Sequence, residues 1–225
     1  MNSRIRNSIF RTLASLLIAG CVVSPSFDGS AAQAQERSTP PAHQEPETSQ
    51  LPAMVRNGLP GPMHERLSAL VGTWQVEMAF YIAGGTKDKP LISRDLICRR
   101  EWITETGNRH LKDVTEGSIG GNRYYRLGLL GYSTMDQGYE WVTVDALNAN
   151  MMIYRGRRDA RSQDISMPGE FTDQGVLGDR YAGQRVGMRT VIRIESPERH
   201  IFELYMTPPK RREFLAARAI YSRQR

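Results

Sequence analysis

The sequence predicts an all-β protein: an antiparallel up-and-down barrel of about ten strands, preceded by a signal peptide and a disordered linker. Three observations lead to this prediction. From residue 63 onward, apolar and polar side chains alternate with a period of two, turn signals separate the alternating runs, and helical periodicity is almost absent. Because consecutive hairpins need no long crossover, they favour a barrel in which each strand pairs with the next along the chain.

The N-terminus has the pattern of an export signal. Arg4, Arg6 and Arg11 precede an apolar run at residues 13–23 (LASLLIAGCVV), with no acidic residue among them. A run of about 11 residues is too short for a membrane-spanning helix, which needs about 20. A basic segment followed by a short apolar one is typical of a secretory signal. We therefore expect the mature protein in the periplasm or cell envelope.

Two cleavage sites compete for this signal. Ala32-Gln33-Ala34 fits ordinary signal peptidase and would make residues 1–34 the signal peptide. Ile18-Ala19-Gly20-Cys21 fits the bacterial lipobox, in which residues 1–20 are removed and Cys21 is lipidated. The sequence leaves both sites open. In the second case the protein would be a lipoprotein, and the lipid on Cys21 would be its one link to a membrane.

Residues 35–62 are expected to be a disordered linker. They are rich in Pro, Gln, Glu and Ser, and they have too few apolar side chains to offset the entropy of ordering. The folded domain is then expected over residues 63–225. It begins with a short helical turn, in which Leu67 and Leu70 lie three residues apart.

The first strand has one apolar and one polar face. Its apolar positions alternate from Gly72 and Trp74 to Ile82, while Thr73 and Gln75 point to the other face. A second strand is expected over residues 91–105. Its residues in phase are Ile92, Leu96, Cys98 and Trp102.

Turn signals mark off the remaining strands. Gly107-Asn108 reads as a hairpin turn, and further turns are expected at residues 120–122 and 135–138. Residues 173–187 are the least regular segment, where we expect a mobile loop. The other strands are expected over residues 109–116, 124–133, 139–145, 151–157, 165–172, 188–195, 201–206 and 213–223.

Charge and cysteine content argue against several kinds of function. The formal net charge is +6, and two Arg-rich spots at residues 155–161 and 210–212 lack the aromatic or helical features of nucleic-acid recognition. We predict no nucleic-acid partner and no specific protein partner. Cys98 is the only cysteine of the expected domain, so no disulfide can form within it. We expect Cys98 to be a buried apolar residue.

The histidines do not have the spacing of metal ligands. The four lie at positions 43, 64, 110 and 200, scattered over the linker, the helical turn, a strand start and a turn. We expect them to be solvated, and we predict no metal site and no cofactor. The chain also has no G-x-S-x-G motif. We predict no catalytic residue.

Several short motifs resemble a known group of proteins. Gly72-Thr73-Trp74 after a helical turn is similar to the G-x-W opening of the calycin (lipocalin-like) superfamily. A closer resemblance is to the bacterial domain-of-unknown-function family fifteen seventy-nine, over residues 64–225. It rests on these motifs: Leu70-Val71-Gly72-x-Trp74, Gly131-Tyr132-Ser133, Tyr139 with Asp145, Met151 and Gly156, Gly169-Glu170, and Tyr221-Ser222-Arg223. The chain departs from the family pattern at Ser133, where an acid is usual, and at Thr143, where a Trp is frequent.

The resemblance implies a calycin-like barrel whose one end is closed by Trp74. In calycins an arginine of the last strand lies across this tryptophan, and by position that residue is Arg223, with Arg218 as second choice. Gly72, Trp74 and Arg223 are thus expected to have a structural role. The family supplies no established chemistry.

A dispersed set of aromatic and polar residues carries the functional prediction. Facing inward, they would line an apolar cavity for a small molecule, although a core filled with side chains remains the alternative. The candidate ligand-binding residues are Phe80, Trp102, Tyr125, Trp141, Thr143, Asp145, Tyr154 and Tyr205.

The sequence leaves three functions open. The first is binding of a small apolar ligand in the barrel. The second is an isomerase or hydrolase that uses Asp145 with a tyrosine at the barrel mouth, against which Asp145 would instead cap the turn at residues 147–150. The third is a structural or interaction module of the envelope that acts through the outer face of the barrel.

Overall fold

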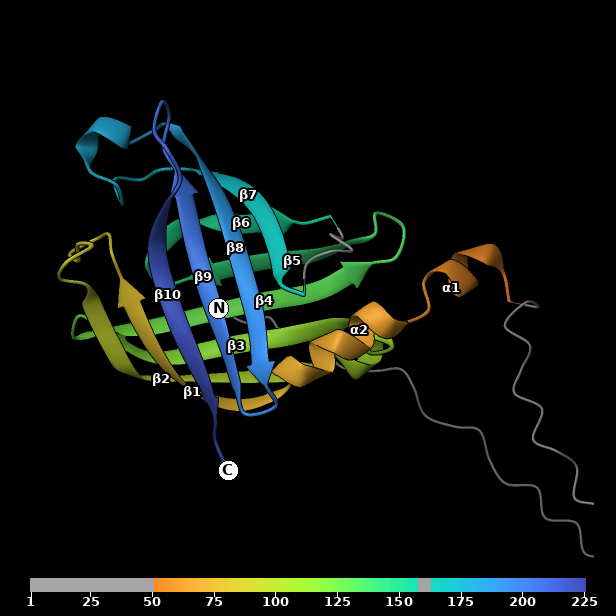
Figure 1. Ribbon diagram of the computed structural model, residues 1–225. Coiled ribbons are helices and arrows are strands. Elements are labelled where there is room, and N and C mark those ends of the chain that lie inside the picture. Colours follow the sequence, from red (N-terminus) through yellow and green to blue (C-terminus); the bar gives the residue numbers. More distant parts are fainter. Residues whose placement is uncertain (1–50, 158–162) are drawn as a thin grey trace, which may run out of the picture. The chain divides into compact units, whose positions relative to one another are not determined.

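The computed structural model describes residues 51–157 and 163–225, and these form a closed antiparallel barrel (Figure 1). The predicted signal peptide, the lipidation candidate Cys21 and linker residues 35–50 lie outside the described residues. The predicted up-and-down barrel is confirmed. Its strands are β1 (Gly72–Phe80), β2 (Leu91–Trp102), β3 (His110–Ile119), β4 (Asn122–Ser133), β5 (Gly138–Asp145), β6 (Asn148–Arg155), β7 (Ile165–Thr172), β8 (Arg185–Ser196), β9 (Arg199–Thr207) and β10 (Phe214–Arg223).

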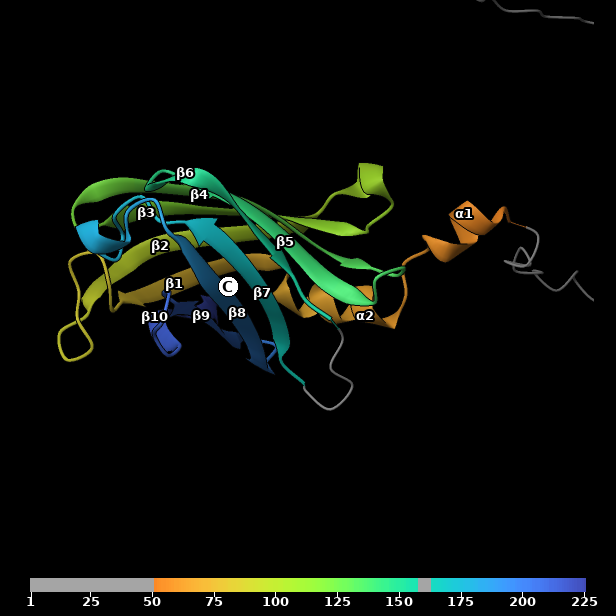
Figure 2. The same cartoon turned by 90° about the horizontal axis from the view of Figure 1, so that it is seen from above.

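Each strand pairs with its neighbours in sequence, and β1 also pairs with β10, which closes the sheet. Trp74 of β1 lies opposite Arg223 of β10 on one side and Cys98 of β2 on the other. Strands β8, β9 and β10 cross over β3, β4 and β5 on the opposite wall (Figures 1 and 2). Closure leaves no unpaired edge in this sheet at which another strand could add.

The helices are short and lie before β1 or in connections. α2 and η2 cover the barrel end at which β1 begins (Figure 1), and their Leu67 and Leu70 are fully buried in the core. The bounds are α1 (Ala53–Asn57), α2 (Pro62–Leu67), and the 3-10 turns η2 (Ser68–Leu70), η3 (Thr104–Thr106) and η4 (Asp179–Tyr181). None of these helices combines the length and apolar character that crossing a membrane requires.

The end of the predicted disordered linker is ordered. Residues 53–57 form α1, and the barrel supplies hydrogen-bond donors to the backbone that follows it. Arg109 Nε donates to the Gly58 carbonyl, and Thr134 Oγ1 donates to the Asn57 carbonyl. Composition alone missed this segment because its order comes from contacts with residues far along the chain, one just before β3 and one just after β4.

A β-bulge shifts the phase of β2. Val76 lies opposite Leu96, but Met78 lies opposite Ser93, so β2 has one residue more than β1 between these pairs. Leu96 is buried, whereas Ile92 is 40% exposed on the outside. The predicted common phase of Ile92 with Leu96 was therefore wrong, because strict alternation does not hold across the extra residue.

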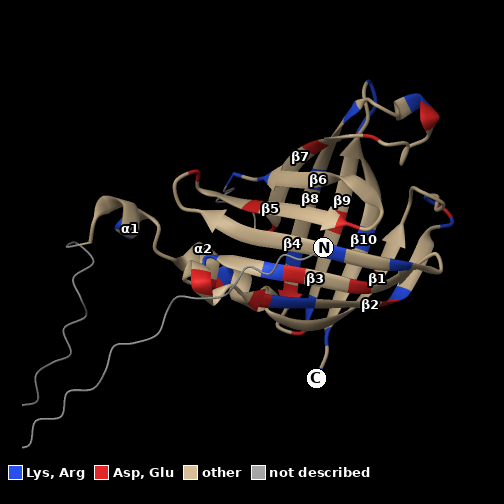
Figure 3. Cartoon of the chain, turned by 180° about the vertical axis from the view of Figure 1, so that it is seen from behind, with Lys and Arg blue, Asp and Glu red and all other residues tan. Residues whose placement is uncertain are grey.

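Charged residues of both signs are spread along the strands and in the loops (Figure 3). Many form cross-strand ion pairs in solvent, such as Arg94 with Glu77 and Arg99 with Glu116. Pairs exposed to this degree contribute about 0–1 kcal/mol each.

Candidate functional site

Trp74 closes the barrel end beneath α2 and η2. Its indole Nε1 donates to the Leu70 carbonyl at 2.9 Å, and the Arg223 guanidinium lies over the ring, 4.2 Å from the centroid. Arg223 also donates to the carbonyls of Val71 at 2.7 Å and Pro197 at 2.8 Å. The backbone can lie this close to the Arg223 side chain only because residue 72 is glycine. Gly72 has φ 126°, and an added Cβ would lie 2.4 Å from Arg223 Nη1.

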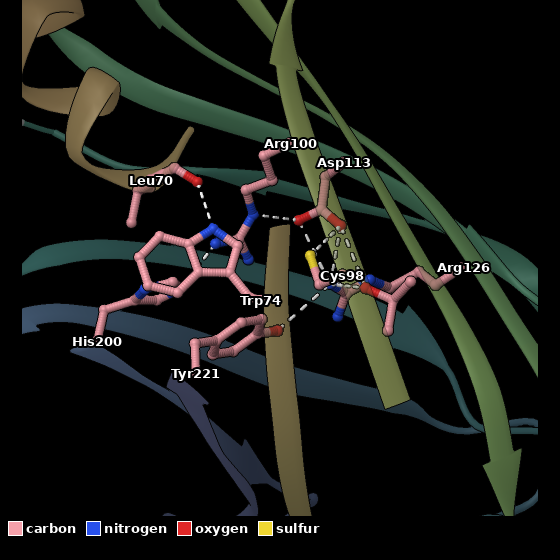
Figure 4. A network of polar contacts seen from close by, with 9 residues as sticks. Leu70, Trp74, Cys98, Arg100, Asp113, Arg126, His200 and Tyr221 are labelled. Atoms are coloured by element: carbon pink, nitrogen blue, oxygen red, sulfur yellow. Dashed lines mark hydrogen bonds and ion pairs between the residues drawn. The ribbon is translucent and has the colours of Figure 1, made fainter. Parts of the chain in front are cut away.

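Above this plug, three buried charges on neighbouring strands form what we call the floor cluster: Arg100, Asp113 and Arg126 (Figure 4). Arg100 Nε donates to Asp113 Oδ2 at 2.8 Å, and Arg126 Nη2 donates to Asp113 Oδ1 at 3.0 Å. Arg126 Nη2 also donates to Thr115 Oγ1 at 3.1 Å. Arg100 lies directly opposite Asp113 across β2 and β3, and Arg126 directly opposite Thr115 across β3 and β4.

The two arginines keep Asp113 ionised in the core. Burial alone would raise the pKa of Asp113, but the charges of Arg126 and Arg100 and the hydrogen bonds they donate hold it well below its usual range. Burial by itself would lower the pKa of both arginines, but Asp113 and the other groups around them raise it, and it lies above its usual value. The floor cluster is therefore fully charged, with two cations and one anion.

His200 of β9 extends the cluster toward the plug. Its ring stacks on Tyr221 with centroids 4.3 Å apart, and Arg100 Nη1 lies 2.7 Å from its Nε2. Because arginine can only donate, Nε2 is the acceptor and the ring proton is on Nδ1. Burial, followed by the charge of Arg100, lowers the pKa of His200 to about 2, so the imidazole is neutral.

The expectation of solvated histidines was therefore wrong for two of them. His200 is 1% exposed and His64 of α2 is 3% exposed. His64 Nδ1 accepts a hydrogen bond from the Gly61 backbone, and its ring meets Tyr132 edge-on. Each is buried because its strand or helix places it in phase with core residues, which scattered spacing in the sequence did not reveal.

Cys98 is a buried core residue on the inner face of β2. Burial raises the pKa of its thiol to about 11, so the sulfur is protonated at neutral pH. The Sγ lies 3.6 Å from Asp113 Oδ1 (Figure 4). These surroundings suit a packed thiol and do not activate a nucleophile.

Beyond the floor cluster, the barrel is hollow. A cavity of about 520 Å³ runs from Arg126 and Trp141 toward the end opposite α2, where the turns after β3 and β5 lie. The wall includes four flexible methionine side chains and two phenylalanine rings: Met78, Phe80, Met152, Met188, Phe202 and Met206. Polar groups are few and include Tyr124, Thr143 and Tyr154. A concave apolar space with a few polar groups is the usual form of a small-molecule site.

The mouth of this cavity is shaped by two loops held by aspartates. Asp145 Oδ1 accepts hydrogen bonds from the backbone N–H groups of Leu147 at 2.8 Å and Asn148 at 2.9 Å. Asp173, 1% exposed, likewise accepts from residues 175–177 and orders the start of the loop expected to be mobile. Val176 of that loop contributes to the cavity wall. Asp145 thus caps its turn while also lining the mouth.

The architecture and the position of the motifs agree with one family model, described as a protein of unknown function (DUF1579), which matches residues 59–223. The chain belongs to the DUF1579 family. The predicted resemblance to the domain-of-unknown-function family fifteen seventy-nine is confirmed. No curated protein matches the chain.

In this DUF1579 domain, the predicted ligand-binding residues divide into two groups. Those that line the cavity are Phe80, Trp141, Thr143, Asp145 and Tyr154. Tyr125 points outward from β4 and is 38% exposed, and Tyr205 lies on the outer face of β9, where its hydroxyl donates to Glu203. Trp102 is in phase with the inner face of β2 but lies at the closed end, packed against the core.

Sequence reasoning missed the floor cluster and the tyrosine and arginine of β4 that meet the cavity. A signal was present. Arg100 is on the same face of β2 as Leu96 and Cys98, and Arg126 is on the same face of β4 as Tyr124 and Leu130. Each charge is therefore in phase with buried residues. A charge on the apolar face of a strand indicates a buried polar network or a binding site.

Proposed function

We propose that the barrel of this DUF1579 domain binds a small, largely apolar molecule in its interior without transforming it. The observation that carries the proposal is the cavity of about 520 Å³ between the floor cluster and the mouth loops. Its volume falls within the range of about 300–1,000 Å³ that is usual for ligand pockets. The thioethers of Met78, Met152, Met188 and Met206 add an adaptable wall, which suits a ligand of irregular apolar shape.

Replacing a side chain of the cavity wall by a larger one tests this proposal. Leu204 lies half-buried on β9 and lines the cavity, so Leu204→Trp would occupy space that a ligand needs. Native mass spectrometry of protein purified from its own host would show a bound molecule in the wild type and much less in Leu204→Trp. Thermal shift with a library of lipids, terpenoids and aromatic compounds supplies the same comparison in vitro.

A matched control is Leu129→Trp, because Leu129 is 42% exposed on the outer face of β4. It adds the same indole without entering the barrel, and binding should be unchanged. A folded wild type that carries no ligand and shows no thermal shift with any library member would refute the proposal.

We also infer that the protein is exported to the periplasm or envelope. The basic and apolar segments at residues 4–23 support this inference, with cleavage after Ala34 or lipidation of Cys21. Intact mass of the membrane-fraction and soluble protein distinguishes the two modes of processing. A mass that retains residues 1–20 would contradict export.

A role as an interaction module is the second candidate. The outer face of β4, β5 and β6 exposes Leu129, Val144, Met151 and Ile153, all at least 38% exposed. Grouped apolar side chains on a surface often mark contacts with other molecules. If this face carried the function, Leu129→Trp would alter the protein's associations in size-exclusion chromatography, whereas Leu204→Trp would not.

A further inference from the structure

We propose that the ligand of the cavity is an amphipathic carboxylate, with its carboxylate against Arg126 and Trp141 at the floor and its apolar part toward the mouth. This inference rests on the proposed function, because it names the chemical class of the molecule that the barrel would bind. Four observations carry it: the bonding of Arg126, the position of Trp141, the charge balance of the floor cluster, and the distribution of charge along the cavity.

Arg126 has donors to spare. The hydrogen bonds that it makes to Asp113, Thr115 and Tyr221 all use Nη2. Its Nε is buried and has no hydrogen-bond partner among the described residues. The side chain is 7% exposed and is among those that line the cavity. A ligand oxygen at Nε would complete the bonding of the arginine.

Trp141, on the neighbouring strand β5, carries a second unpaired donor. Its Nε1 is also buried and has no partner in the described part of the chain, and Arg126 Cζ lies 5.1 Å from its ring centroid. Gly128 of β4 makes this position possible, since an added Cβ would lie 2.6 Å from Trp141 Nε1. Two buried N–H donors without partners among the described residues, on neighbouring side chains that line one cavity, are the groups that a carboxylate with two acceptor oxygens would satisfy.

The floor cluster carries an excess positive charge. Arg100 and Arg126 are opposed by Asp113 as the ionised acid within it. Burial raises the pKa of Cys98 and of Tyr221, so neither supplies a negative charge, and His200 is neutral. A single buried cation without a counter-ion is unfavourable. A monoanionic ligand would balance the charge.

The charges that line the cavity differ in sign between its two ends. Arg126 and Asp145 are the charged residues among the described residues that line it, the first at the floor and the second at the mouth. Asp145 Oδ1 is engaged by the backbone of its own turn. Outside the mouth, a neighbouring groove bears Arg180, Arg211 and Arg212, which would attract an approaching anion. Within the cavity itself, an anionic head is attracted to Arg126 at the floor and repelled by Asp145 at the mouth.

The test compares two probes with the same tail. Isothermal titration calorimetry at neutral pH measures binding of dodecanoate and of 1-dodecanol, and then of the matched acid and alcohol pairs with eight to sixteen carbons. The charge-assisted hydrogen bonds at the floor should make the acid bind about tenfold or more tightly than the alcohol of equal length.

Two variants locate this preference. Arg126→Gln removes the excess charge and leaves the Arg100–Asp113 pair neutral, and it should reduce the preference for the acid to about twofold or less. Trp141→Phe keeps an aromatic ring and removes one donor, and it should weaken acid binding about fivefold while leaving alcohol binding unchanged. Tyr125→Phe, on the outer face of β4, is the control and should change neither.

The outcomes separate the two proposals. Equal affinity of folded wild type for acid and alcohol would overturn the carboxylate inference while leaving an apolar ligand in the barrel. A preference for the acid that persists in both Arg126→Gln and Trp141→Phe would overturn the assigned position. If neither probe of any length binds the folded wild type, both proposals fail. Trp141→Phe keeps the test valid should Arg126→Gln not fold.

Discussion

The interior of the barrel has two halves that are built from the same strands and filled in opposite ways. Toward α2, the strands contribute Trp74, Arg100, Asp113, His200 and Tyr221, which are buried and joined by hydrogen bonds and stacking (Figure 4). Toward the other end, the same strands contribute methionine, phenylalanine and leucine side chains that surround open space. Arg126 lies at the boundary and belongs to both halves.

The difference indicates a division of labour. A buried network in which several charges pair across neighbouring strands restricts the geometry of those strands, and it fixes their relative positions. An apolar wall around a cavity imposes no such geometry and can adapt to a guest. The closed half thus holds the barrel in shape, and the open half is the part that the proposed ligand would occupy.

The largest effect that would test this division is the loss of the central anion. Asp113→Asn leaves Arg100 and Arg126 buried without a counter-charge, and it should lower the free energy of unfolding by about 3–5 kcal/mol. Urea denaturation measures it. The control on the same strand is Glu116→Gln, which removes an exposed ion pair with Arg99 and should cost no more than about 1 kcal/mol. Similar costs for the two variants would contradict a structural role for the floor cluster.

The two halves should also differ in their response to the same truncation. Leu96 is fully buried beside the closed half, so Leu96→Ala would leave a new void and should cost about 2–5 kcal/mol. Leu204 is half-buried and already faces the cavity, so Leu204→Ala should cost about 1 kcal/mol. Denaturation of both variants under one set of conditions gives the comparison. A cost for Leu204→Ala as large as that for Leu96→Ala would mean that the open half is packed in solution.

The third effect is a pH dependence that arises in the closed half. The pKa of His200 is about 2 in the folded protein and near 6.5 when unfolded, so its contribution to stability is complete above pH 6.5 and is lost as the pH falls. Between about pH 5.5 and 4.5, the free energy of unfolding should decrease by about 1.4 kcal/mol per pH unit on account of this residue.

His200→Gln isolates that slope. Glutamine can still accept a hydrogen bond from Arg100 and does not titrate, so the pH slope in this window should decrease by nearly the full amount. His64, whose pKa is also lowered by burial, contributes a remainder in both proteins. Asp113 has a lowered pKa as well, and its contribution is lost only below its unfolded value of about 3.9. An unchanged slope in His200→Gln would show that the imidazole is accessible to solvent.

Much of the fold could be predicted because alternation is a local property. The inner face of β1 and the bounds of β7 follow directly from period two between turn signals. The errors in the predicted strands also have local causes. A single extra residue in β2 reversed the phase of Ile92, and the start of β9 at Arg199 placed His200 inside, where a turn had been expected.

The candidate site could be predicted only in part. Phe80, Trp141 and Tyr154 line the cavity as their strand phase suggested, but phase does not say how far along the barrel a residue lies. Trp102 shows this, since it has the inward phase but lies at the closed end of the barrel. Tyr125 and Tyr205 were included as aromatic residues without an assigned face, and both point outward.

By itself, the sequence determined the all-β class, the order of the hairpins, the membership of the family and the residues that share a strand face wherever no bulge intervenes. Only the tertiary structure decided which charges meet. Arg100, Asp113 and Arg126 lie on three strands, and their contact depends on the register between β2, β3 and β4. The hollow above them was likewise decided in three dimensions, because empty space depends on how side chains from many strands fit together, and no single strand encodes that sum.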